Sequence, residues 1–89
     1  MRQIHRTSQF KRDVKRMERR GKDLNRLGTV LRVLVQGEAL PPEYRDHLLV
    51  GQYKGTRECH VEPDWLLLYE VSDTELILIR TGSHADLFK

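Results

Sequence analysis

The chain has 89 residues, of which 33% are charged and 38% hydrophobic, as is ordinary for a globular protein with one modest core. Its longest apolar run covers only residues 65–69, whereas a transmembrane helix needs about twenty residues. No apolar segment of a secretory signal follows Arg2 and Arg6, and the single cysteine, Cys59, excludes an internal disulfide and a cysteine-rich zinc site. We therefore expect a single domain over residues 1–89, in the cytoplasm and without a membrane partner.

The net charge of +3 is distributed unevenly along the chain. Residues 1–36 hold eleven Lys and Arg against three acids, a balance of +8, whereas residues 37–89 hold five against ten, a balance of −5. A basic helical half is typical of a protein that contacts phosphate, and such attraction weakens with salt as counterions are released. The alternative is that these charges only form solvated helix faces.

The basic half predicts a short strand and a first amphipathic helix. The strand covers residues 2–6, and Thr7 or Ser8 can cap the helix after it by accepting a backbone N–H. Gly21 ends the helix. Three residues at helical spacing form its apolar face: Phe10, Val14 and Met17. Basic residues cover the rest and extend just past its end: Lys11, Arg12, Lys15, Arg16, Arg19, Arg20 and Lys22.

A second helix is predicted to begin at Lys22 or Asp23 and to end at Gly37. Its apolar face contains Leu24, Leu27, Leu31 and Leu34. Gly28 in its middle costs about 1 kcal/mol relative to alanine, so we expect this glycine to permit close approach to the neighbouring helix. The two helices form an antiparallel pair whose apolar faces rest on a sheet.

The second half of the chain predicts an antiparallel sheet. After the connector at Pro41 and Pro42, the hydrophobic period changes from that of a helix to that of a strand. Residues 47–51 are expected to form a short strand or the approach to one, and strands are expected over 56–61, 65–71 and 75–81. Turns are expected at 52–55 and 72–74, and one helical turn in the tail at 82–89. The strand at 65–71 is apolar enough to be central and covered on both faces. The fold class is therefore α+β, with a mainly antiparallel sheet of four or five strands, two antiparallel helices on one face and a short C-terminal helical turn.

Three histidines and one aspartate lie at the predicted strand ends. His47, His60 and His84 lie on or beside strands, and Asp64 follows Pro63 in a stiff corner. If the meander closes, these residues converge near one edge of the sheet. Cleavage of RNA by its own 2′-OH needs a base, an acid and a cation on the phosphate, and histidine can carry the proton in either direction near neutral pH. The cluster therefore suits RNA cleavage.

Other residues could complete such a site. Arg80 could stabilise charge on the phosphate, and Trp65 or Phe88 could stack on a splayed base. Each of these residues also has a structural explanation, because histidines are often surface groups and aromatic residues usually pack in the core. Zinc binding is a weaker alternative, since no H-x-E or H-x₃-H spacing on a helix supports it.

Four motifs resemble a known family over essentially the whole chain. They are Tyr44-x-Asp46-His47-x-Leu49, Gly51-x-x-x-Gly55-x-Arg57, His60-Val61-Glu62-Pro63-Asp64-Trp65 and Arg80-Thr81-Gly82-Ser83-His84-Ala85-Asp86-Leu87-Phe88. The chain in this respect is similar to the YafQ branch of the RelE superfamily of bacterial toxins. The resemblance implies a compact RelE-like domain and an mRNA interferase that cleaves the codon in the ribosomal A site and is neutralised by a cognate antitoxin similar to DinJ or RelB.

The resemblance also implies roles for particular residues. It places His47, His60, Asp64 and His84 in the catalytic set, with Asp64 or His60 as the base and His84 as the acid. Trp65 and Phe88 match the family's tryptophan and tail phenylalanine. The chain departs from many relatives at Leu48, where they have proline.

The sequence thus leads to a ribosome-dependent endoribonuclease that uses neither a metal nor a cofactor. The seven basic residues of the first helix would bind ribosomal RNA, and operator DNA would be bound only through the antitoxin complex. The main rival is a non-catalytic module that binds nucleic acid and antitoxin in operator autoregulation. A histidine-rich metal protein is a third hypothesis.

Overall fold

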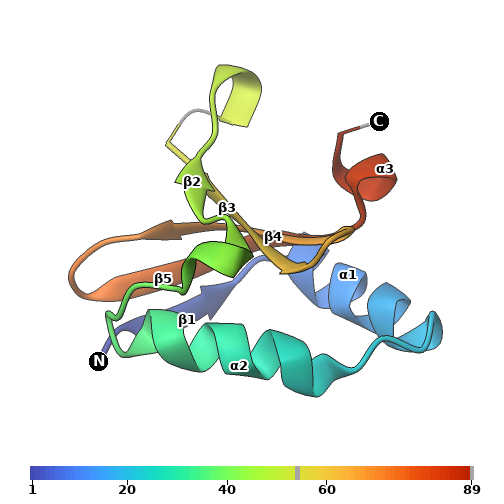
Figure 1. Cartoon of the computed structure of the whole chain (residues 1–89), viewed down its shortest axis with the longest axis horizontal. Coiled ribbons are helices and arrows are strands. Elements are labelled where there is room, and N and C mark those ends of the chain that lie inside the picture. The colour runs from blue at the N-terminus through green and yellow to red at the C-terminus, as the bar shows by residue number, and fades with distance from the viewer. Residues whose placement is uncertain (54, 89) are drawn as a thin grey trace.

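The computed structural model describes residues 1–53 and 55–88, without the side chain of Gln52. Two layers make up this part of the chain, a sheet and a pair of helices beneath it (Figure 1). The strands are β1 (Gln3–Arg6), β2 (His47–Leu48), β3 (Arg57–Glu62), β4 (Trp65–Val71) and β5 (Glu75–Gly82). The helices are α1 (Ser8–Arg19), α2 (Leu24–Val35) and the short α3 (His84–Leu87), and two 3₁₀ turns, η1 (Pro42–Tyr44) and η2 (Gly51–Tyr53), flank β2.

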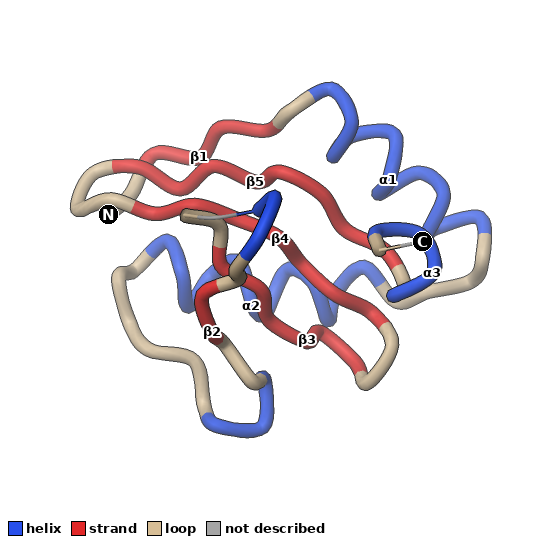
Figure 2. The backbone as a smooth tube through the Cα atoms, turned by 90° about the horizontal axis from the view of Figure 1, so that it is seen from above, coloured by secondary structure: helices blue, strands red, loops and turns tan. Residues whose placement is uncertain are grey.

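The sheet has five strands in the order β1-β5-β4-β3-β2, which Figure 2 shows from above. The predicted meander is confirmed, since β3, β4 and β5 pair antiparallel in succession. The strand predicted at residues 47–51 is shorter, because β2 pairs with β3 only through His47 and Leu48. At the opposite edge β1 pairs with β5 in parallel, so the sheet is mixed although mainly antiparallel.

Both long helices form where the sequence predicts them. The Thr7 side chain caps α1 by accepting the Phe10 N–H, and the Asp23 side chain caps α2 by accepting the Asn25 N–H. Gly21 follows α1 with a φ of +84°, a conformation that favours glycine. The buried apolar residues of the two helices are Phe10 and Met17 in α1 and Leu27, Val30 and Leu34 in α2. Both helices cover the same face of the sheet.

The central strand β4 is buried on both faces, as its continuous apolar run predicts. Trp65, Leu67 and Tyr69 pack in the core between the sheet and the helices α1 and α2. Leu66 and Leu68 point to the other face and pack with the α3 residue Leu87. The short α3 is therefore held over the face opposite the long helices. No helix in the described part of the chain is long and apolar enough to cross a membrane.

Gly28 does not have the packing role expected from the sequence. A Cβ placed on it would meet only the flexible Arg32 side chain, at 3.5 Å, so no neighbouring helix approaches here. Its backbone is ordinary helix, and no positive φ requires glycine. The expected close helix contact at this position was wrong.

Replacing Gly28 with alanine is therefore expected to stabilise the protein by about 0.5–1 kcal/mol, because alanine loses less backbone entropy in a helix. Urea unfolding of both proteins measures the difference. Gly37→Ala is the matched control, since this glycine has a φ of +78° and alanine there is strained. A loss of stability in Gly28→Ala would mean that the site is more tightly packed than its contacts indicate.

Candidate active site

The predicted histidines and the aspartate gather on the α3 side of the sheet. His60 lies on β3 directly opposite Leu66, whose side chain packs with α3, and directly paired residues share a face of the sheet. Asp64 is in the β3–β4 turn, His84 begins α3 and His47 begins β2. The structure thus brings all four residues to one end of the sheet from four separate elements.

His84 and Asp64 form a tight pair. The His84 Nδ1–H and the His84 backbone N–H both donate to Asp64 Oδ1, at 2.6 and 2.9 Å. These two bonds, the backbone bond foremost, lower the pKa of the Asp64 carboxyl, so it is ionised near neutral pH and only accepts. The proton on His84 is therefore fixed at Nδ1, and Nε2 remains available on a side chain that is 54% exposed.

The position of His84 is set by the start of α3. Ser83 caps this short helix by accepting the Asp86 N–H, while Asp86 accepts the Ser83 N–H in return. Two further bonds, of 2.6 and 3.0 Å, join the Arg20 guanidinium to the Asp86 carboxylate. The predicted helical turn in the tail is thus confirmed, and it is held against the end of α1.

His60 is the least exposed of the four groups. Its side chain is 12% exposed, and its ring centroid lies 5.8 Å from that of His84, with the two planes at 59°. His60 Nε2 is 3.5 Å from Glu58 Oε1, which is close enough for an ion pair when the imidazole is protonated. Of the two neighbouring histidines, His60 therefore lies beside Glu58 and His84 beside Asp64.

His47 joins the same group through Glu58. Its Nδ1–H donates to the Arg45 carbonyl at 2.6 Å, which leaves Nε2 3.4 Å from Glu58 Oε1. The buried carboxylate of Glu58 therefore lies between two histidines. Our reading of the sequence missed Glu58, although the strand period already placed it on the same face as His60, two residues away.

Arg80 is bound to a protein carboxylate. Its Nε and Nη2 donate to Asp13 Oδ2 and Oδ1, both at 3.0 Å, and its side chain is only 24% exposed. The hydrogen bonds to Asp13 raise the pKa of Arg80. The charge expected to stabilise phosphate is thus largely compensated within the protein. Asp13 was also missed, although it interrupts the apolar face of α1 between Phe10 and Val14.

The two predicted aromatic residues have different environments. Trp65 is fully buried, and its Nε1–H donates to Thr81 Oγ1 at 2.9 Å, so its ring has no face open to a base. This differs from the stacking role expected from the sequence and makes Trp65 a core residue beneath the site. Phe88 is 41% exposed and meets Tyr53 edge to face, with ring centroids 5.7 Å apart. Tyr53 had no assigned role in the sequence.

The seven basic residues predicted to bind ribosomal RNA, which lie in α1 and just after it, divide into paired and free groups. Arg16 pairs with Asp13, Arg20 with Asp86 and Lys22 with Glu62. The remaining four are exposed, and within residues 1–53 and 55–88 they form no ion pair: Lys11, Arg12, Lys15 and Arg19. The predicted basic surface is thus narrower than the charge count alone indicates.

Cys59 is buried, and burial first, with nearby carboxylates, raises the pKa of its thiol to about 12. It packs in the core, as its place in a strand predicts. Among the described residues no group of three or more histidine, cysteine or acidic side chains is arranged to hold a metal ion.

A family model described as "Bacterial toxin of type II toxin-antitoxin system, YafQ" matches residues 2–89. The class of protein is therefore that of the toxins of type II toxin–antitoxin systems. The chain belongs to the YafQ family of bacterial toxins. The resemblance to the YafQ family is thereby confirmed.

Three relatives illustrate the similarity. The chain is 44% identical over 88 residues to an mRNA interferase toxin YafQ of Escherichia coli K12, covering 98% of this chain and 96% of the relative. The toxin in an E. coli DinJ–YafQ complex superimposes with a TM-score of 0.93 at 43% identity over 100% of both chains. A metal-bound toxin from Helicobacter pylori gives a TM-score of 0.91 at 40% identity, covering 99% of this chain and 100% of that one.

Proposed function

We propose that this YafQ-family toxin is a ribosome-dependent endoribonuclease that cleaves mRNA in the A site. The observation that carries the proposal is the pair of histidines His60 and His84, whose rings are 5.8 Å apart and each lie beside a carboxylate. Two proton carriers at this separation can act on opposite sides of one phosphate. The E. coli relative that shares 44% of its sequence is named an mRNA interferase.

In the proposed reaction His60 acts as the base. Its imidazole takes the proton from the ribose 2′-OH, and Glu58, 3.5 Å from Nε2, stabilises the imidazolium that forms. The 2′-oxygen then bonds to phosphorus while the bond from phosphorus to the 5′-oxygen breaks. His84 acts as the acid in its doubly protonated form, in which Nδ1–H stays bonded to Asp64 and Nε2 gives the second proton to that leaving oxygen. The products are a 2′,3′-cyclic phosphate and a free 5′-OH.

Asp64 fits an orienting role better than that of the base. Its Oδ1 already accepts two hydrogen bonds from His84, and the same bonds lower its pKa, which makes the carboxylate a weaker base. A carboxylate on Nδ1 holds the imidazole in one tautomer and stabilises its charged form, as in other acid–base sites. His47 lies on the far side of Glu58 from His60. When it is protonated, its imidazolium adds a positive charge to the site.

The partners follow from the same proposal. The free cations of α1 would bind ribosomal RNA, and the ribosome would present the codon to the site. The E. coli relative is found in a complex with DinJ, so we propose a DinJ-like antitoxin as the neutralising partner, with operator DNA bound through that complex. Because translating ribosomes are the target, the protein would act in the cytoplasm. We propose that the reaction needs neither a cofactor nor a metal. We also propose that residues 1–89 form a single domain.

Incubation with programmed ribosomes and with the same mRNA alone tests the proposal. We expect cleavage at the A-site codon on ribosomes and a rate at least tenfold lower on free mRNA, because the protein offers few groups that read bases. His60→Ala is the control for a contaminating nuclease. Equal cutting in both samples, or none in either, contradicts the proposal. Salt-sensitive binding without scission would instead support the non-catalytic module, and elemental analysis of untagged protein would detect a bound metal.

A further inference from the structure

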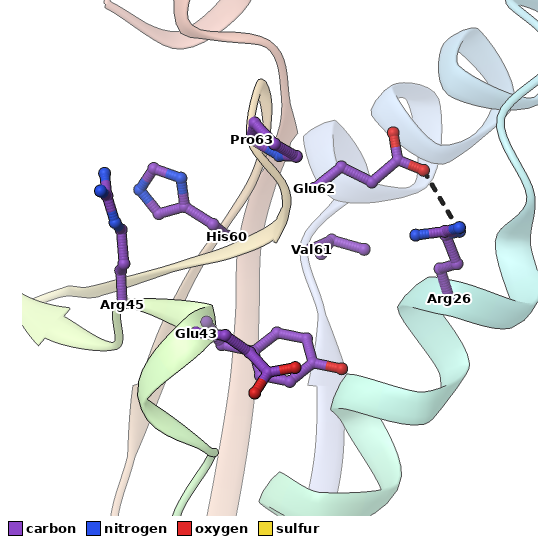
Figure 3. A pocket seen from close by; sticks show the side chains of 8 residues that line it. Arg26, Glu43, Arg45, His60, Val61, Glu62 and Pro63 are labelled. Atoms are coloured by element: carbon purple, nitrogen blue, oxygen red, sulfur yellow. Dashed lines mark ion pairs between the residues drawn. The ribbon is translucent and has the colours of Figure 1, made fainter.

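A cavity of about 400 Å³ opens beside His60 (Figure 3). One wall is the end of η1, with Tyr44 and Arg45, and the other is the outer edge of β3 with the turn after it, residues 60–63. Its volume lies within the range of small-ligand sites. His60 lines this cavity, but His84 and Asp64 do not, so the cavity lies next to the catalytic pair and not between its members.

The cavity exists because β2 is short. Its two residues pair with Arg57 and Glu58, so the outer edge of β3 beyond Glu58 has no strand beside it. The chain passes this edge through η1 instead and turns back at Arg45, whose φ of +51° is unusual for a residue other than glycine. This turn directs Arg45 to the cavity and its carbonyl to His47, which donates to it at 2.6 Å. The backbone carbonyl of Arg45 is thus hydrogen-bonded to His47, one of the four catalytic candidates.

The charges around the cavity leave Arg45 as the available cation. Arg26 also lines it, but its guanidinium is held in an ion pair with Glu62 at 3.4 Å, and Glu62 also pairs with Lys22 at 3.0 Å. Glu43 lines the same cavity, yet in Figure 3 its carboxylate lies away from the Arg45 guanidinium and the His60 ring. Arg45 is exposed and forms no ion pair with any described carboxylate.

We propose that this cavity is the subsite for the nucleotide next to the scissile bond, and that Arg45 binds the RNA phosphate there. The inference rests on the proposed endoribonuclease function and extends it. A guanidinium suits this role because it can donate two parallel hydrogen bonds to a phosphate. Tyr44, Val61 and Pro63 supply the apolar surface against which the base or ribose of that nucleotide packs. Arg45 thus takes the phosphate-binding role that the sequence suggested for Arg80. The Arg80 guanidinium is instead held in an ion pair with Asp13.

A cycle that combines a protein change with an RNA change tests the subsite. The mRNA carries an uncharged methylphosphonate at one or the other linkage next to the scissile one, and single-turnover cleavage is measured on programmed ribosomes. For the wild-type protein we expect one of the two RNAs to be cut about tenfold more slowly, the usual scale for losing a hydrogen bond to a charged group. Arg45→Gln should cut natural mRNA about tenfold more slowly than the wild type does. Its rate on that modified RNA should be less than twofold below its own rate on natural mRNA.

Two further variants sharpen the result. Arg45→Lys keeps the charge and should recover part of the loss, whereas Arg26→Gln removes a compensated charge from the same cavity and should keep the wild-type response to the methylphosphonate. Circular dichroism and thermal unfolding verify that each variant is folded. If Arg45→Gln keeps the full methylphosphonate penalty at the linkage to which the wild type is sensitive, the subsite is overturned.

The subsite and the function can fail separately. If the wild-type protein binds programmed ribosomes without cutting, the endoribonuclease proposal fails, and the same cycle measured as dissociation constants with a 2′-O-methyl codon still decides the role of Arg45. If the wild-type protein does not bind the RNA at all, both proposals are overturned.

Discussion

Replacing His84 with alanine is expected to slow A-site cleavage by at least about a hundredfold, the usual scale for a lost proton-transfer group. The residue has a free Nε2 on an exposed ring whose other nitrogen is held by Asp64. Since the ring is 54% exposed and packs little, the free energy of unfolding should change by less than about 1 kcal/mol. Single-turnover cleavage on programmed ribosomes and urea unfolding measure the two effects.

The pH profile of the rate distinguishes the roles of the two histidines. With His60 as base and His84 as acid, the wild-type rate should rise and then fall as the pH increases. His84→Ala should lose the alkaline fall, and His60→Ala should lose the acidic rise. A profile in which His60→Ala keeps its acidic rise and Asp64→Asn loses it would make Asp64 the base.

Replacing Asp13 with alanine is expected to destabilise the protein by about 3 kcal/mol, which is the low end for breaking a buried ion pair because Arg80 and Arg16 stay partly exposed. The Asp13 carboxylate has no exposed surface and accepts from both arginines and from the Thr81 backbone N–H. Its loss leaves buried donors without a partner and removes the polar contacts between α1 and β5. Urea unfolding at pH 7 measures the effect. Asp73→Asn in the exposed β4–β5 turn is the control and should change stability by less than about 0.5 kcal/mol.

The contribution of Asp13 should also depend on pH. Burial acts to raise the pKa of this carboxyl, but hydrogen bonds from Arg80, Gln9 and Thr81 outweigh it and lower the pKa below its ordinary value. A lowered folded-state pKa stabilises the protein fully above the unfolded value of about 3.9 and loses that contribution as the pH falls below it. The difference between wild type and Asp13→Ala should thus be constant from pH 7 to pH 5 and shrink towards pH 3. A difference under 1 kcal/mol at pH 7, or one that does not shrink, contradicts this account.

Local patterns in the sequence were sufficient to predict the helices, the strands and the buried centre of the sheet. The caps at Thr7 and Asp23 and the apolar run of β4 involve neighbours in the chain, and their energetics act over a few residues. The catalytic candidates were also recognisable, because His47, His60, Asp64 and His84 lie on or beside strands and in motifs that resemble the YafQ family.

The tertiary structure alone decided which residues face one another. The parallel pairing of β1 with β5 joins Gln3 to Glu75, and no local pattern encodes a contact between such distant residues. The same holds for Asp13, whose position in α1 places it against Arg80, and for Glu58, which only the pairing of β2 with β3 brings beside His47. Ion pairing and the burial of an aromatic ring depend on which residues are neighbours in space. The residues that compensate a cation or bury a tryptophan are therefore decided by packing and not by spacing along the chain.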